Sequence, residues 1–149
     1  MIEKINLATN NIAILGALTQ NEIEYLLKFL NRKDYSKGEI VYCQNSSPEN
    51  IYIVEVGTVQ MRINTDFKNN FSKTYNIGDC FGQTALLGII PNIGECIALS
   101  DVTLLELSKF SFHKLSKENN QIFVKLLLNL TREICRYNHY IINKSLENR

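Results

Sequence analysis

The sequence NIYIVEVGTVQ, residues 50–60, predicts two short strands joined by a tight turn at Gly57. Its first half is rich in β-branched and aromatic residues, which pack well on a pleated sheet. From Thr58 to Ile63 polar and apolar residues alternate strictly, as they do in a strand with one buried face. A glycine suits the junction because a side chain would be costly in so tight a turn. The middle of the chain therefore predicts an antiparallel sheet.

Outward from this stretch, the chain divides into three blocks without a long linker, and we expect one domain over residues 1–149. The predicted fold class is α+β and mainly β. It is an antiparallel β-roll, or double-stranded jelly roll, flanked by N-terminal helices and a long C-terminal helix. The N-terminal helices, the β-roll and the C-terminal helices are expected at residues 1–34, 35–107 and 108–149.

Capping residues give the starts of the predicted helices. Thr19 and Glu22 have the spacing of a capping box, in which each side chain accepts a backbone N–H of the other. Ser108 can cap a short helix, and either Asn119 or Asn120 can then cap a long one. No glycine or proline interrupts residues 120–146, so this helix can extend roughly 40 Å at the standard rise.

Two features interrupt the strand block. Residues 64–70 are rich in asparagine and aspartate, which favour turns, and they predict the tip of a hairpin. The apolar stretch at residues 84–90 does not alternate and predicts one or two helical turns between strands.

The composition excludes several classes of protein. The formal net charge is +1, from 16 basic and 15 acidic side chains, so the chain has no basic excess for nucleic acid or an anionic membrane. No apolar run approaches the ~20 residues of a membrane span, and the N-terminus lacks the pattern of a signal peptide. We therefore expect a cytoplasmic protein that contacts neither nucleic acid nor membranes directly.

Cysteine and histidine usage argues against a metal site, a disulfide framework or a catalytic dyad. We expect reduced, mostly buried thiols, because no Cys-x-x-Cys pair is formed by Cys43, Cys80, Cys96 and Cys135. His113 and His139 lie outside the strand block, whereas a metal enzyme built on a β-roll would need several histidines inside it. Known nucleophile, phosphate-loop and zinc-protease motifs are absent from the sequence. The prediction is a protein that is not an enzyme and holds no metal or cofactor.

Four motifs follow one another in the order and spacing of a known family: KGEIVY (37–42), NIYIVEVGTVQ (50–60), IGDCFGQTALL (77–87) and ALSDVTLLEL (98–107). Over about residues 20–145 the chain resembles the cyclic nucleotide-binding domain family. That family includes the catabolite activator (Crp/Fnr-like) type of regulator, kinase regulatory subunits and gated channels. The resemblance implies a β-roll with a long C-terminal helix that serves signalling or regulation and not catalysis.

The resemblance also implies where a cyclic nucleotide would bind. In the family, a phosphate-binding cassette at the start of the short helix holds the cyclic phosphate and the ribose. Backbone amides at a helix N-terminus can receive a phosphate, and a glycine lets the ligand approach closely. The cassette positions fall here on Gly82, Gln83, Thr84, Ala85, Asn92 and Ile93.

Three of these positions depart from the family pattern. Gln83 replaces a glutamate that accepts from the ribose hydroxyl, and its amide oxygen can still accept without charge assistance. Asn92 replaces the arginine that pairs with the phosphate, and Ile93 replaces a small polar residue. Hydrogen bonds to charged groups contribute roughly 1.5–3 kcal/mol, so losing the arginine predicts an affinity lower by about tenfold to a hundredfold. Glu95, two places further on, predicts additional repulsion of an anion.

We therefore predict a degenerate pocket with weak or no binding of cyclic AMP and cyclic GMP. Two alternatives stay open. One is a working sensor of a cyclic nucleotide or another small ligand, and the other is a dimerising subunit of a transcription regulator whose DNA reader is on another chain. Arg62 and Lys73 are two cations of the strand block that would have to replace the missing charge, and the sequence does not show whether either reaches the pocket.

The long C-terminal helix carries an apolar repeat at alternating steps of four and three residues, which is the heptad pattern of a coiled coil. The repeat consists of Phe123, Leu127, Leu130, Ile134, Tyr137 and Ile141. In the family this helix often pairs with its copy, so a homodimer through this seam is predicted, with a different protein partner as a further candidate. The alternative is an amphipathic helix that folds back on its own domain.

Overall fold

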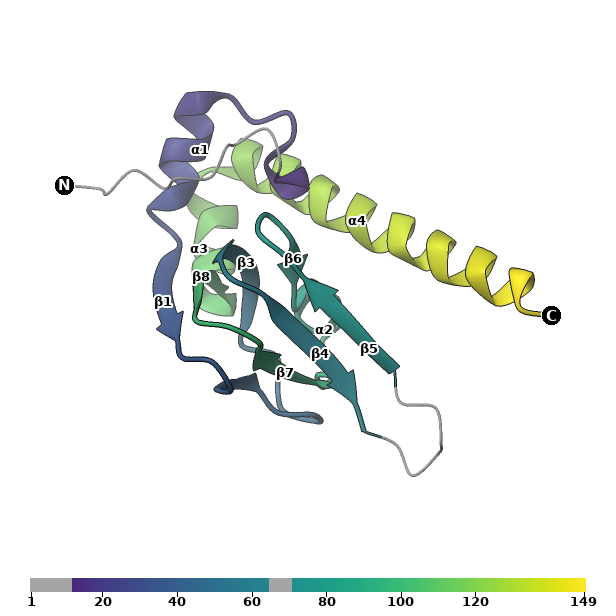
Figure 1. Cartoon of the computed structure of the whole chain (residues 1–149). Helices are drawn as coiled ribbons and strands as arrows, with labels where there is room; N and C mark the ends of the chain where they lie inside the picture. Colours follow the sequence, from purple (N-terminus) through teal and green to yellow (C-terminus); the bar gives the residue numbers. More distant parts are fainter. Residues whose placement is uncertain (1–11, 65–70) are drawn as a thin grey trace.

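The structure is a computed structural model, and it describes residues 12–64 and 71–149. Two four-stranded sheets face each other in a β-roll, and helices pack on the outer face of one sheet (Figure 1). This arrangement confirms the predicted fold class. Residues 1–11 of the predicted helical block and residues 65–70 of the predicted hairpin tip lie outside the described residues.

Within residues 12–64 and 71–149 eight strands form the roll, and every pairing between neighbouring strands is antiparallel. The strands are β1 (Asn31–Tyr35), β2 (Ile40–Tyr42), β3 (Asn50–Val56), β4 (Val59–Ile63), β5 (Phe71–Tyr75), β6 (Cys80–Phe81), β7 (Glu95–Ala98) and β8 (Val102–Ser108). The first sheet has the order β1-β8-β3-β6, and the second has the order β2-β7-β4-β5. The chain therefore crosses repeatedly between the two sheets, as in a jelly roll.

The described residues form five helices, and the three with predicted capping residues begin at them. They are the 3₁₀ helix η2 (Ala13–Leu15), α1 (Gln20–Leu27), α2 (Gln83–Gly88), α3 (Lys109–Glu118) and α4 (Asn120–Glu147). At α1 the capping box is present: the Glu22 N–H donates to Thr19 Oγ1 at 3.2 Å, and the Thr19 N–H donates to Glu22 Oε2 at 2.8 Å. Ser108 and Asn119 each accept a backbone N–H from three residues further on, at 3.0 and 3.1 Å, and so cap α3 and α4.

Strand β3 is buried on both faces, and its alternating side chains serve two separate cores. Ile51 and Ile53 pack in the core between the first sheet and helices α1, α3 and α4. Tyr52 and Val54 point the other way, into the core between the two sheets. Strand β8, its neighbour, divides its side chains in the same manner. Strand β4 of the second sheet turns one face outward, as its alternating sequence predicted.

Residues 31–35 form β1, which corrects the prediction of helix up to residue 34. Helix α1 ends at Leu27, and the polar residues that follow show no alternation because four of the five side chains of β1 are exposed. The strand is set by its antiparallel pairing with β8. At its end the Tyr35 hydroxyl donates to Oε1 of the buried Glu106 at 2.5 Å, which ties β1 to β8 through side chains as well.

Gly57 joins β3 to β4 at a position where only glycine fits. Its φ is +85°, in the left-handed region that side chains disfavour. A Cβ atom there would lie 2.3 Å from the carbonyl oxygen of Asp101 and 2.7 Å from Oγ of Ser100. The Thr58 N–H donates to the same Ser100 hydroxyl at 3.1 Å, so the turn is held closely against the loop before β8.

Replacing Gly57 with alanine is expected to destabilise the protein more than replacing Gly38, which has a φ of +88° and no neighbouring atom within 4 Å of its added Cβ. Gly38→Ala should cost about 1–2 kcal/mol for the left-handed backbone alone. Gly57→Ala should add about 1–3 kcal/mol for the steric overlap. Urea unfolding of both variants measures the difference, and equal losses would show that close packing at Gly57 is not the constraint.

Candidate ligand-binding site

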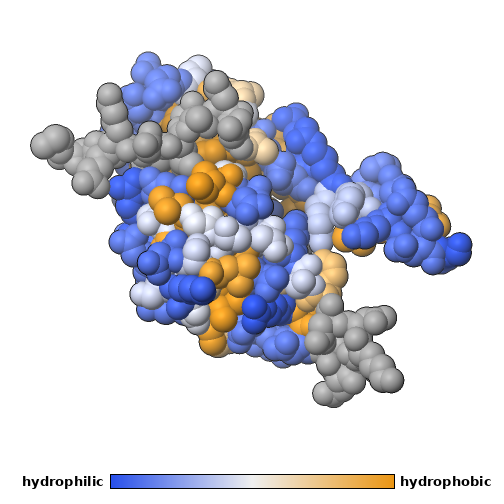
Figure 2. All heavy atoms as spheres, in the orientation of Figure 1, coloured by the Kyte–Doolittle hydropathy of each residue, from blue (hydrophilic) through white to orange (hydrophobic). Residues whose placement is uncertain are grey.

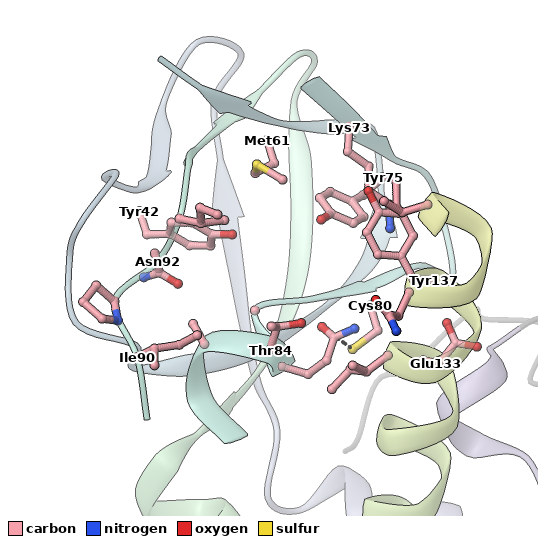
Figure 3. Close-up of a pocket in the computed structure, with 18 residues that line it drawn as sticks. Tyr42, Met61, Lys73, Tyr75, Cys80, Thr84, Ile90, Asn92, Glu133 and Tyr137 are labelled. Carbon is pink, nitrogen blue, oxygen red and sulfur yellow. Dashed lines mark hydrogen bonds between the residues drawn. The ribbon is translucent and has the colours of Figure 1, made fainter. Parts of the chain in front are cut away.

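A cavity of about 390 Å³ lies between the second sheet, α2 and α4 (Figure 3). Its wall consists of side chains from β2, β4, β5, α2, the loop after α2 and the middle of α4. The six cassette positions predicted from the sequence all lie in this wall: Gly82, Gln83, Thr84, Ala85, Asn92 and Ile93. The structure brings these residues together, and their role in holding a ligand stays a prediction.

Gly82 fixes the start of α2, the short helix predicted at residues 84–90 and observed at Gln83–Gly88. Its φ is +84°, and a Cβ atom would lie 2.8 Å from the carbonyl oxygen of Asn50 and 3.0 Å from the ring of Tyr52. Both contacts belong to β3. The glycine therefore lets α2 begin directly against the first sheet, which positions this helix as one side of the cavity.

Aromatic side chains stack in the core between the two sheets, and two of them, Tyr42 and Tyr75, also line the cavity. The ring of Phe81 lies 4.8 Å from that of Tyr52 and 4.9 Å from that of Tyr75, measured between centroids. Tyr42 extends the cluster, with its ring centroid 6.2 Å from that of Phe81. Burial raises the pKa of Tyr42 and of Tyr75 well above the usual range, so both hydroxyls stay protonated.

The buried thiols near the cavity are not nucleophiles. Burial raises the pKa of Cys96 to about 12, and it raises the pKa of Cys80 still further, so both stay protonated at neutral pH. The Cys80 thiol donates to Oε1 of Gln83 at 3.7 Å. Cys43 and Cys135 are exposed, so the expectation of mostly buried cysteines is correct for only two of the four.

Asn92 anchors a neighbouring loop. Asn92 is only 5% exposed, and its Nδ2 donates a hydrogen bond to Oγ of Ser46 at 3.1 Å. The backbone repeats the contact, since the Asn92 N–H donates to the Ser46 carbonyl at 2.9 Å and the Asn92 carbonyl accepts from the Asn45 N–H at 2.8 Å. This anchoring role was missed in the sequence, because no local pattern connects residues 46 positions apart.

Glu95 does not line the cavity, which corrects the expected repulsion of an anion. It begins β7 opposite Arg62 of β4, and strand alternation turns the next residue, Cys96, inward. Arg62 is exposed, and its Nε donates to Oε1 of Gln60 at 2.6 Å. Neither charge therefore belongs to the cavity wall.

Lys73 of β5 does line the cavity and supplies a cation there. Its Nζ lies 3.5 Å from the ring centroid of Tyr137 on α4 and 5.1 Å from that of Tyr75. Burial lowers the pKa of the ammonium, and the negative charges of Asp79 and Glu133 act in the opposite direction. The sequence signal that could have placed Lys73 is its two-residue spacing from Tyr75, which puts both side chains on one face of the strand.

The heptad seam predicted on the long helix turns toward its own domain. The seam residues are Phe123, Leu127, Leu130, Ile134, Tyr137 and Ile141. Leu130 is fully buried, and the ring centroid of Phe123 lies 4.9 Å from that of Phe112 of α3. The last three seam residues line the cavity. Leu130 is the one buried residue of the six and the other five are half-buried, so pairing of the seam with a partner stays a prediction, beside the folded-back alternative.

A different face of α4 carries exposed apolar side chains, which we term the outer stripe. Val124, Leu128, Ile142 and Leu146 are 43%, 47%, 50% and 56% exposed, and Cys135 between them is exposed as well. Steps of four and seven residues return to the same side of a helix, so the five share one face. In the view of Figure 2 the projecting part of α4 is mostly hydrophilic with apolar atoms at intervals.

The described part of the chain shows no metal cluster and no membrane span. In residues 12–64 and 71–149, no group of three or more His, Cys, Asp or Glu could hold a metal ion. Both histidines, His113 and His139, are exposed. Of the helices in the same ranges, none is long and apolar enough to cross a bilayer.

Comparison with known proteins gives a family and several relatives. The family model described as the cyclic nucleotide-binding domain matches residues 32–119. The chain is 30% identical over 105 residues to a cAMP-dependent protein kinase regulatory subunit of Debaryomyces hansenii, covering 70% of this chain and 23% of that protein. It is 25% identical over 152 residues to Potassium channel KAT2 of Oryza sativa subsp. japonica, and this match covers 99% of this chain and 24% of the channel. The chain thus spans about a quarter of the length of these relatives.

Solved structures share the fold. A cyclic nucleotide-binding domain from Methylobacillus flagellatus superposes with a TM-score of 0.84 at 14% identity, over 94% of this chain and 83% of that one. The catabolite activator protein of Thermus thermophilus superposes with a TM-score of 0.75 at 20% identity, over 91% of this chain and 64% of that one. At these identities the likeness concerns the fold alone, and it agrees with the β-roll and long C-terminal helix described above.

The contact between Asn92 and Ser46 should be measurable as a coupling energy. In a double-mutant cycle with Asn92→Ala and Ser46→Ala, we expect a coupling of about 0.5–1.5 kcal/mol in urea unfolding, the net value of one hydrogen bond. As a control, Asn92→Ala combined with Ser145→Ala on the exposed end of α4 should be additive. Additivity in both cycles would mean that Asn92 does not anchor the loop through its side chain.

Proposed function

Because this chain belongs to the cyclic nucleotide-binding domain family, we propose that it is a non-catalytic regulatory module that binds cyclic AMP and cyclic GMP weakly or not at all. The relatives in the comparison are regulatory subunits of kinases and a channel, which supports a regulatory class. The weak binding rests on one observation: the amide of Asn92, at the position of the family's phosphate-binding arginine, is committed to Ser46.

The loss of the arginine decides the affinity for a cyclic phosphate. A guanidinium gives a charged and often bidentate grip on phosphate, whereas the side chain of Asn92 is neutral and its Nδ2 already donates to Ser46. Backbone amides at the start of α2 can still attract a phosphate, and Gln83 can still accept from a ribose hydroxyl. These weaker contacts favour residual binding over none.

The chemistry of the cavity wall supports a non-catalytic role. The Cys80 thiol and the Tyr42 and Tyr75 hydroxyls stay protonated because burial raises their pKa values. Among the described residues of the wall, no nucleophile is hydrogen-bonded to a base, an arrangement that covalent catalysis requires.

The position of α4 supports a regulatory response to a ligand. Ile134, Tyr137 and Ile141 of this helix line the same cavity as the cassette positions. A molecule that fills the cavity would contact α4 directly and would favour one position of the helix over another. Such a response is a population shift between two arrangements, driven by the ligand's different affinity for each.

Isothermal titration with 3′,5′-cyclic AMP and cyclic GMP tests the proposal. We expect dissociation constants weaker than about 100 µM for the natural chain, corresponding to less than about 6 kcal/mol of binding energy. Asn92→Arg should strengthen binding by about tenfold to a hundredfold, because it adds a charged hydrogen bond to the phosphate.

Asn92→Met is the matched control, because it also loses the contact with Ser46 but adds no charge. It should leave the weak affinity unchanged. Micromolar or tighter binding of either nucleotide by the natural chain, at one site per chain, would contradict the proposal and favour a working cyclic nucleotide sensor.

We also propose that two copies associate through the outer stripe of α4. Part of the predicted heptad seam packs on the chain's own domain, whereas Val124, Leu128, Ile142 and Leu146 are exposed on another face. A dimerising subunit in transcription would further need a partner chain with a DNA reader, since a net charge of +1 gives no support for direct DNA contact.

Ile142→Gln should weaken this dimer, whereas Tyr140→Gln should not. The two side chains are similarly exposed, at 50% and 54%, but residues two apart face opposite sides of a helix. Burying an apolar side chain contributes about 1.5–3 kcal/mol, so the dimer dissociation constant should rise at least about tenfold. Sedimentation velocity over a concentration series measures it, and a monomer throughout or equal effects of both variants would rule out the stripe.

A further inference from the structure

We infer that the ligand of this cavity is a small organic acid with an apolar body, whose anionic group binds Lys73 at the α4 end. The inference rests on the proposed function, since it assumes that the cavity is a ligand site and names the ligand class. It reverses the orientation that the family cassette implies, because the anion would lie beside α4 and β5 and not at the start of α2.

The cavity has its positive charge at one end only. Figure 3 shows Lys73, Tyr75 and Tyr137 on one side, with Asn92 and Ile90 on the other. Among the described residues of the wall, Lys73 is the only lysine or arginine. The end that a cyclic phosphate would occupy is flanked instead by apolar groups of the loop after α2 and by the neutral, committed amide of Asn92.

The surroundings of Lys73 favour binding of an anion, because its ammonium is half-buried and has no carboxylate partner among the described residues. It is half-buried, and its Nζ lies against the ring of Tyr137, at 3.5 Å from the centroid, with Tyr75 at 5.1 Å. No carboxylate of the described residues forms an ion pair with it. The two ring faces replace only part of the hydration that this ammonium loses on burial. A negatively charged partner would therefore stabilise it more than the rings do.

The carboxylates nearest to Lys73 are engaged elsewhere. Glu133 lines the same cavity, but its Oε1 pairs with Arg136 at 3.6 Å. Asp79 accepts the backbone N–H of Asn76 at 2.8 Å. Both act on Lys73 at longer range and favour its charged form, which burial alone opposes. The ammonium of Lys73 therefore keeps N–H donors that no carboxylate of the described residues occupies.

The remaining wall determines the body of the ligand. Met61, Ile134 and Ile141 and the tyrosine rings form an apolar lining, and Gln83 and Thr84 offer a few polar contacts. The volume of about 390 Å³ lies near the lower end of the ~300–1,000 Å³ typical of ligand pockets. An aromatic monocarboxylate of one or two rings fits this combination of size, apolar wall and single cation.

Matched acids and amides test this assignment. Isothermal titration of the full chain would compare indole-3-acetate with indole-3-acetamide, and phenylacetate with phenylacetamide. We expect at least one acid to bind about tenfold to a hundredfold more tightly than its amide, as a charge-assisted hydrogen bond predicts. Lys73→Met should abolish the preference for the acid, and Lys73→Arg should retain it. Thermal unfolding of both variants would confirm that each is folded.

Three results would overturn the inference: equal affinity for acid and amide, a preference that survives Lys73→Met, or no binding of either acid. Titration of the same proteins with cyclic AMP separates this outcome from the proposed function. Weak cyclic AMP binding without acid preference would leave the regulatory proposal standing and remove only the assignment to Lys73. Tight cyclic AMP binding together with a Lys73-dependent acid preference would contradict the proposed weak binding of cyclic nucleotides and leave the assignment to Lys73 standing.

Discussion

The burial of β3 on both faces is the constraint on which the rest of this structure depends. Ile51 and Ile53 form a core with the helices, and Tyr52 and Val54 form a second core inside the roll. The helices and the second sheet are therefore held to the same strand from opposite sides. Since Gly82 also packs on β3, the position of α2 and the shape of the cavity follow from that strand as well.

Helix α4 combines three surfaces that act on one another. Its first half is part of the helical core through buried residues such as Leu126 and Leu130, and its middle lines the cavity with Ile134 and Tyr137. The outer stripe lies on a further face of the same helix and is exposed. One helix of 28 residues connects these surfaces without an intervening loop, so in the proposed response a displacement at the cavity would reach the stripe through the helix itself.

The cavity keeps the architecture of its family while its charges are arranged differently. Asn92 is fastened to Asn45 and Ser46 by three hydrogen bonds, and the positive charge of the cavity wall comes from Lys73 on β5. The backbone framework, including the left-handed Gly82 before α2, is that of the sequence motif. The fold and the charges of the cavity wall are thus separable here, as function and fold are in other widely used folds.

The sequence by itself determined the features that depend on neighbours along the chain. Thr19, Ser108 and the pair Asn119 and Asn120 marked helix starts, with Asn119 the observed cap. The alternation after Gly57 predicted a half-buried strand, because caps and strand periodicity are local properties. The family motifs extended this to the roll and to the six cassette positions, which do lie in one cavity wall.

Only the tertiary structure decided the features that join distant segments. Residues 31–35 are a strand because β8 pairs with them, and Asn92 is an anchor because Ser46 lies beside it. Phe123 and Leu130 of the seam pack in the helical core, and Lys73 reaches Tyr137, because the roll folds against that helix. A sequence pattern records that an apolar face needs a partner, and the packing of the whole chain determines which surface supplies it.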